Sequence, residues 1–156
     1  MAGYDKLTPE GKKFYAEVEK LKGNEVFIGF QAGKKMHTDE DGKEVDVAEI
    51  AAFNELGTST SPSRPFLRQS VDDNKDKISA MCERAAKDLA NGGSAEQGLK
   101  KLGAFGVSLV QEKIRNGSFK PNAESTIKAK GSDKPLIDTG QMRQSVHYVI
   151  RQKGGG

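Results

Sequence analysis

Side chains of the types needed for catalysis occur at a few places in this chain of 156 residues, most clearly at Asp138-Thr139-Gly140. In aspartic proteases this tripeptide carries one of two carboxylates that share a proton across two lobes or two subunits. A half-site also needs a β-rich lobe after the catalytic loop, and here 16 residues follow Gly140. We therefore expect Asp138 or Thr139 to cap a short helical turn that begins at Gly140, without protease chemistry.

The other candidates for chemistry are the single cysteine, the two histidines and an acidic loop. Cys82 is expected on the apolar face of a helix, where a buried thiol is inert. His37 falls in a polar loop and His147 in the last expected strand, without an activating pattern around either. A calcium loop with its invariant glycine at Gly42 would place a histidine first and Ala48 last, so both key carboxylates are missing. No Walker loop, dinucleotide fingerprint or zinc spacing occurs. We predict no metal, no cofactor and no enzymatic activity.

Composition and charge narrow the range of partners. The net charge is +3, and basic residues alternate with acidic ones on several elements. Weak, non-specific contact with DNA stays open, mainly where many copies line one surface. No stretch approaches the roughly 20 apolar residues of a membrane span, and the first residues lack the apolar region of a signal peptide. We expect a protein made in the cytoplasm, with no membrane partner. The basic residues that could contact DNA phosphates are Lys12, Lys13, Lys34, Lys35, Lys100, Lys101, Lys128 and Lys130.

The elements that must position these residues begin with a helix. Thr8 and Pro9 are a typical helix start, because a hydroxyl caps the first turn and proline suits its first position. Val26 to Phe30 is β-branched and aromatic, which predicts a strand buried on both faces. Residues 33–46 are polar around Asp41-Gly42, which indicates a protruding, mobile hairpin loop.

The stretch from Ala48 to Leu67 is the most distinctive. Gly57 follows a short helix directly, as a residue with no Cβ does at a helix C-terminus. Pro62 and Pro65 restrict the backbone on both sides of Arg64, so we expect a stiff arm. Apolar residues recur at helical spacing before the glycine and predict one buried face: Ile50, Phe53 and Leu56.

Two further helices should form an antiparallel pair. The first is expected from Phe66 to about Asn91 and is predicted to be the longest. Ser94 and Gln97 form a capping box that starts the second. Glycines cost up to ~1 kcal/mol each in a helix, so we expect them to mark close helix-to-helix approach, within the fold or across a subunit boundary. They are Gly98, Gly103 and Gly106.

A strand should follow at Val146 to Arg151, where apolar residues alternate. The predicted fold class is therefore α+β. A small antiparallel β-sheet packs against the N-terminal helix and the long antiparallel helix pair, with the hairpin loop at 33–46 protruding. Residues 1–152 form a single domain, and residues 153–156 form a flexible tail. A short helix is also expected after Asn122.

Two stretches resemble the same family. Ala48 to Thr58 and Pro62 to Leu67 resemble the "E-x-G-T … P-x-R-P-F-L" signature of small tailed-bacteriophage proteins, known as tail-completion, head–tail joining (neck), minor tail or virion morphogenesis proteins. Pro135 to Ser145 resembles the later "P-L-x-D-T-G-x-L-x-x-S-I" segment, with Met142 and Val146 as conservative departures. The two motifs occur in the family's order, with the helix pair between them.

The resemblance implies a structural virion protein that completes or terminates the tail and joins it to the head. It implies a homo-oligomeric ring in the neck, six- or twelve-fold, beside tail-tube or tail-terminator proteins and portal or head-completion proteins. A ring repeats one head-to-tail contact, so each subunit presents two different surfaces. Our hypothesis places an interface at Gly57, Thr58, Pro62, Arg64, Pro65, Phe66, Asp138, Thr139, Gly140 and Arg143.

Three alternatives stay open at this point. The loop from Gly57 to Phe66 could serve only to position the helix that follows it. The protein could be a nucleic-acid-associated assembly factor that contacts packaged DNA. The third, a protease of capsid maturation, would require Asp138 as its catalytic carboxylate.

Overall fold

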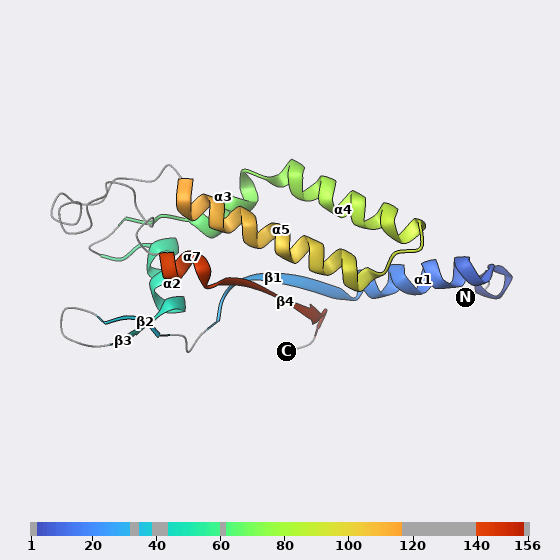
Figure 1. The fold of residues 1–156 in the computed structure, drawn as a ribbon, viewed down its shortest axis with the longest axis horizontal. Helices are drawn as coiled ribbons and strands as arrows, with labels where there is room; N and C mark the ends of the chain where they lie inside the picture. The colour runs from blue at the N-terminus through green and yellow to red at the C-terminus, as the bar shows by residue number, and fades with distance from the viewer. Residues whose placement is uncertain (1–2, 32–34, 39–43, 60–61, 117–139, 155–156) are drawn as a thin grey trace.

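The structure is a computed structural model that describes residues 3–31, 35–38, 44–59, 62–116 and 140–154 (Figure 1). It has the predicted α+β fold, with a two-stranded antiparallel sheet packed against helices. The elements in chain order are η1 (Tyr4–Lys6), α1 (Pro9–Lys22), β1 (Asn24–Phe30), β2 (Lys35–Thr38), β3 (Glu44–Asp46), α2 (Val47–Leu56), α3 (Phe66–Asp72), α4 (Lys75–Ala90), α5 (Ala95–Asn116), α7 (Gly140–Gln144) and β4 (Val146–Gln152). The short helix expected after Asn122 lies outside the described residues.

The main sheet joins the first strand to the last. β1 and β4 pair antiparallel in continuous register, with Val26 opposite Ile150 and Ile28 opposite Tyr148. One face of this ribbon packs on α5, which Figure 1 shows between the ribbon and α4. The prediction that β1 is buried on both faces is wrong, because Phe27 on the other face is 49% exposed. A two-stranded ribbon with helices on one side leaves its second face uncovered.

The glycines of α5 allow the close approach that their cost suggested. A Cβ at Gly98 would lie 3.3 Å from the Cβ of Ala85 on α4, so this contact joins two helices as predicted. A Cβ at Gly103 would collide with the ring of Tyr148 on β4, and one at Gly106 with the Cδ1 of Ile28 on β1. At Gly103 and Gly106 the missing side chain therefore lets a strand of the sheet approach α5, and only at Gly98 does it let another helix approach. All three contacts lie within the subunit.

The helix expected from Phe66 to Asn91 is broken. α3 ends at Asp72 and α4 begins at Lys75, so the 22-residue α5 is longer than the 16-residue α4. Side chains compete for backbone carbonyls at the break: Ser70 Oγ donates to Leu67 O at 2.7 Å, and Asn74 Nδ2 donates to Ser70 O at 2.8 Å. Such bonds offer the backbone an alternative to a continuous helix.

The break changes which side chains α4 buries. Cys82 was expected on a buried face and is exposed, whereas Leu89 on the same helix is buried. The prediction for Cys82 is therefore wrong. The antiparallel pairing of α4 with α5 is confirmed, and Gly92 in the turn between them has a positive φ of 91°. Gln97 N donates to Ser94 Oγ at 3.2 Å, which is the first half of the predicted capping box.

The smaller sheet is a hairpin within the loop predicted at 33–46. β2 pairs antiparallel with β3, and the register shifts between Lys35 and His37. Asp41 and Gly42, on which the hairpin prediction rested, lie outside the described residues. Figure 1 shows the two strands beside α2, separate from the main ribbon.

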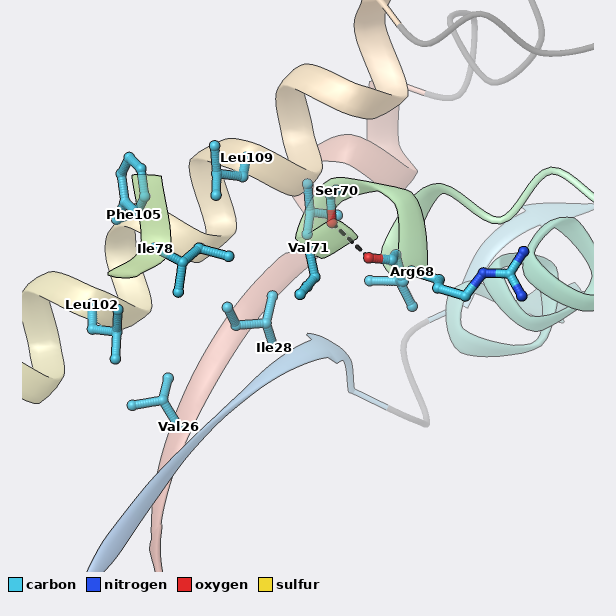
Figure 2. A pocket seen from close by; sticks show the side chains of 12 residues that line it. Val26, Ile28, Arg68, Ser70, Val71, Ile78, Leu102, Phe105 and Leu109 are labelled. Carbon is cyan, nitrogen blue, oxygen red and sulfur yellow. Dashed lines mark hydrogen bonds between the residues drawn. The ribbon is translucent and has the colours of Figure 1, made fainter. Parts of the chain in front are cut away.

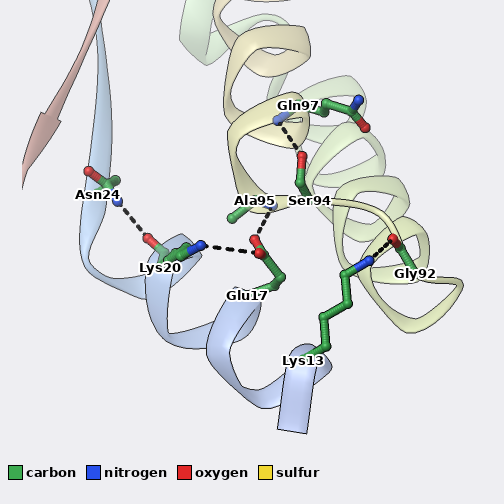
Figure 3. A network of polar contacts seen from close by, with 8 residues as sticks. All are labelled: Lys13, Glu17, Lys20, Asn24, Gly92, Ser94, Ala95 and Gln97. Atoms are coloured by element: carbon green, nitrogen blue, oxygen red, sulfur yellow. Dashed lines mark hydrogen bonds and ion pairs between the residues drawn. The ribbon is translucent and has the colours of Figure 1, made fainter. Parts of the chain in front are cut away.

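Hydrogen bonds join helix α1 to the turn between α4 and α5 (Figure 3). Thr8 caps α1 as predicted, accepting a hydrogen bond from Gly11 N at 3.0 Å. The Glu17 carboxylate accepts from Ala95 N at 2.8 Å, at the start of α5. Lys13 Nζ donates to Gly92 O at 2.9 Å. The bond from Ala95, and then the one from Lys20, holds the pKa of Glu17 below its ordinary value of 4.5.

Glu17→Gln should therefore lower the melting temperature in a pH-dependent way. A carboxyl group whose pKa is lowered by folding stabilises the protein at pH values above its ordinary pKa. This stabilisation disappears as the pH falls through the lowered pKa. We expect a clear difference from wild type near neutral pH that shrinks below about pH 4. Thermal unfolding across this range measures it, with Glu19→Gln as the control because Glu19 faces solvent beside Lys22. A pH-independent difference would contradict the electrostatic origin.

Candidate functional site

The candidate site is the segment that leads from α2 through the loop into α3. Asp46 begins it, because its Oδ1 accepts a hydrogen bond from Ala48 N at 2.8 Å and caps α2. Gly57 ends α2 with a φ of 77°, a region that favours glycine, as the sequence predicted. Gly57 N still donates to Phe53 O at 2.8 Å, so the loop leaves the helix in a defined direction.

Glu55 joins the end of α2 to the start of α3. Its Oε2 accepts from Leu67 N at 2.8 Å and its Oε1 from Arg68 N at 3.1 Å. Its backbone carbonyl accepts from Ser63 Oγ at 2.8 Å. Pro65, the residue before α3, makes no side-chain cap bond, so Glu55 supplies the cap from another helix. This role is not visible in the sequence, because the carboxylate lies 12 and 13 residues along the chain from the amides that it binds.

The backbone on both sides of Pro65 is also held. Arg64 N donates to Asn54 O at 2.6 Å, which ties the loop back to α2. Phe66 N donates to Arg64 O at 2.8 Å around Pro65, whose φ of −77° and ψ of 66° are those of an inverse γ-turn. These bonds tie the arm from Arg64 into α3 to its surroundings, and its stiffness stays a prediction.

Phe66 anchors this arm in the core. Its side chain is 0% exposed and meets the ring of Phe30 edge-on, with centroids 5.9 Å apart and planes at 78°. The predicted interface includes Phe66, but within the subunit its side chain is covered. Its position explains why the loop is fixed, and other residues must supply the contact surface.

The same core includes the second motif. Met142 is 0% exposed and belongs to the cluster around Phe66, so α7 and the start of α3 share one core. The buried members of the cluster are Val47, Ala51, Phe66, Val110, Ile114, Met142 and Val146. The two motifs that resemble one family are therefore brought together in space, although the helix pair separates them in sequence.

The other predicted interface residues lie in different settings. Thr58 and Pro62 are exposed in the loop, and Arg64 is partly buried. Gly140 is the first residue of α7, where the sequence placed the start of a turn. Arg143 is partly buried, and its carbonyl accepts from Gln111 Nε2 at 3.2 Å. Asp138 and Thr139 lie outside the described residues, and so does the cap predicted from them.

Two apolar side chains of α2 are exposed beside this loop. Phe53 is 48% exposed and Leu56 is 78% exposed, so the prediction that they share a buried face with Ile50 is wrong. We call Phe53 and Leu56 the α2 patch. Buried Val47 and Ala51 face the core in their place. Sequence analysis missed the patch, because helical spacing does not show which apolar side is covered.

The described residues of this region do not form a metal centre. Among the described residues, no three or more His, Cys, Asp or Glu side chains gather where they could hold a metal ion. In the same part of the chain, no helix is long and apolar enough to span a bilayer. Comparison with protein-family models, curated proteins and solved structures finds no match for this chain. Inferences about function therefore rest on the motifs and on the geometry of α2, the loop and α3.

Proposed function

We propose that this protein is a structural component of a tailed-phage virion that completes the tail and joins it to the head as a homo-oligomeric ring in the neck. The observation that carries the proposal is the exposed α2 patch beside a loop held by Glu55. Leu56 exposes 78% of its surface at the end of α2, directly before Gly57. Its proposed neighbours in the virion are a tail-tube or tail-terminator protein and a portal or head-completion protein.

Physical reasoning supports a role in assembly. Exposed apolar side chains that lie together commonly mark protein–protein contacts. A contact made by a preorganised loop loses less conformational entropy than one made by a loop that must first be ordered. The bonds of Glu55 and of Arg64 N provide that preorganisation. The proposal includes no catalytic step.

Leu56→Asp and Arg64→Ala should weaken ring formation and leave the subunit folded. Charge on an exposed apolar contact removes a central part of the interface, and we expect a loss of at least about tenfold in association. Native mass spectrometry and sedimentation measure assembly, and circular dichroism measures folding. Leu7→Asp is the matched control, since Leu7 is also an exposed leucine, at 39%, and lies before α1.

The outcomes separate the possible functions. Loss of rings in both α2-loop variants but not in Leu7→Asp supports the proposal. If Arg64→Ala unfolds the subunit with no separate assembly defect, the loop only positions α3. A wild-type protein that forms no ring, alone or with its tail-tube or portal partner, refutes the ring. Steeply salt-dependent retention on DNA would favour the DNA-associated assembly factor instead.

A further inference from the structure

Strand β1 has one edge that no other described strand covers. The main sheet contains β1 and β4 alone among the described residues, so each strand pairs on one side only. Proteins usually protect such edges with lysine, proline or a β-bulge. β1 has no lysine and no proline, and its register with β4 is continuous. Its one charged residue is Glu25, near its start.

The ladder shows which backbone groups face this edge. Lys153 N donates to Gly23 O at 2.9 Å, one step beyond the pair of Asn24 with Gln152. In an antiparallel pair, hydrogen-bonded and non-hydrogen-bonded positions alternate. The odd-numbered residues of β1, such as Phe27, therefore direct their N–H and C=O groups to β4. Val26 and Ile28 direct theirs to the open edge.

An apolar groove lies beside the same edge (Figure 2). Its volume is about 380 Å³. The strand residues that line it are Val26 and Ile28 of β1, and none comes from β4. Figure 2 shows these two side chains pointing into the space toward Val71 of α3 and Ile78 of α4. Helix α5 contacts both strands, with Tyr148 against Gly103 and Ile28 against Gly106. It also lines the groove, through residues that include Leu102, Phe105 and Leu109.

Arg68 supplies a charge at one end of the groove. It is exposed near the start of α3, and Figure 2 shows its guanidinium directed away from the apolar residues. Among the described residues the guanidinium makes no ion pair and no hydrogen bond, and the bond to Glu55 comes from the backbone N of Arg68. A carboxylate on a ligand would complement it.

We propose that β1 and this groove bind an extended strand of a partner protein by β-augmentation. The partner strand pairs with the N–H and C=O groups of Val26 and Ile28. It places apolar side chains at alternate positions in the groove, and it has a carboxylate at the end beside Arg68. A single strand without a covering helix fits, because α3, α4 and α5 already line the groove beside β1. The β4 of a second copy does not fit, because its own α5 covers the same face. The inference does not rest on the proposed virion role.

A synthetic peptide tests the site on the full chain. The probe has about nine residues, with valine alternating with threonine, aspartate at one end and a fluorophore at the other. Fluorescence anisotropy measures its binding, and hydrogen exchange by NMR measures the amides of β1. We expect slower exchange at Val26 and Ile28 and no change at Phe27, whose amide is already paired with β4.

Matched variants locate the binding. Val71→Asp should weaken peptide binding by at least about tenfold, because it places a charge in the groove. Leu7→Asp is the control and should bind normally, since Leu7 is also an exposed apolar residue, at 39%, and lies before α1, outside the groove. Arg68→Glu should reverse the preference between peptides that end in aspartate and in lysine.

Several results would overturn the inference. They are no binding at millimolar peptide, equal binding by Val71→Asp and wild type, and binding that leaves the exchange of Val26 and Ile28 unchanged. Protection that appears with protein concentration and without peptide would assign the edge to a second copy and reject a foreign strand. None of these results depends on ring formation, so the site and the proposed function succeed or fail separately.

Discussion

Phe66→Ala should lower the free energy of unfolding by about 3–5 kcal/mol. Phe66 is fully covered, contacts Phe30 edge-on and lies in the cluster that holds both motifs together. Its removal leaves a cavity in this cluster that the surrounding side chains fill only in part. Urea unfolding followed by circular dichroism measures the loss, which is a large part of the stability of a typical domain, about 5–15 kcal/mol.

Phe53→Ala is the matched control for this substitution. The residue type is the same, but Phe53 is 48% exposed on α2, so we expect a loss below about 1 kcal/mol. The pair also tests how the interface is assigned. If Phe66→Ala leaves stability unchanged and removes only assembly, then Phe66 is a contact residue and its anchoring role is wrong.

Gly103→Ala should destabilise the fold although it replaces glycine in a helix. Alanine gains up to ~1 kcal/mol of helix propensity. Its Cβ, however, would collide with the ring of Tyr148, which lies between α5 and β4. Overpacking of this kind costs typically about 1–3 kcal/mol, and ring atoms attached to a strand have little room to move. We therefore expect a net loss, measured by thermal and urea unfolding.

Two controls isolate the collision. Gly29→Ala on the uncovered face of the ribbon should not destabilise the protein, because a Cβ there meets nothing within 4 Å. In a Tyr148→Ala background, Gly103→Ala should no longer lower the free energy of unfolding. It should show only the increase that comes from the higher helix propensity of alanine. Additive effects of the two substitutions would contradict the predicted contact, because residues in contact are coupled.

Local features could be predicted from the sequence. Thr8 caps α1, Gly57 ends α2 with a positive φ, and Ser94 starts α5. Each of these signals acts through a hydrogen bond or a backbone angle within about four residues, so neighbouring residue types are sufficient to specify it. The α+β class and the pairing of α4 with α5 follow from the same local signals taken in order.

The candidate site could be predicted only in part. The stiffness around Pro65 was visible, because proline restricts its own φ and the residue before it. The bond from Glu55 to Leu67 and Arg68 was not, because the partners become neighbours only when α2 and α3 pack. For the same reason Phe66 could be named as part of a motif, while its burial against Phe30 could not.

Which apolar faces become buried was decided by packing between distant elements. The spacing of Phe53 and Leu56 identified an apolar side of α2, but Val47 and Ala51 are the residues that the core covers. Gly103 and Gly106 indicated close contact in the sequence, and only the folded chain places Tyr148 and Ile28 against them. A residue's own type and spacing set what its segment can form. Burial also requires a second surface, and that surface comes from a part of the chain that local sequence does not specify.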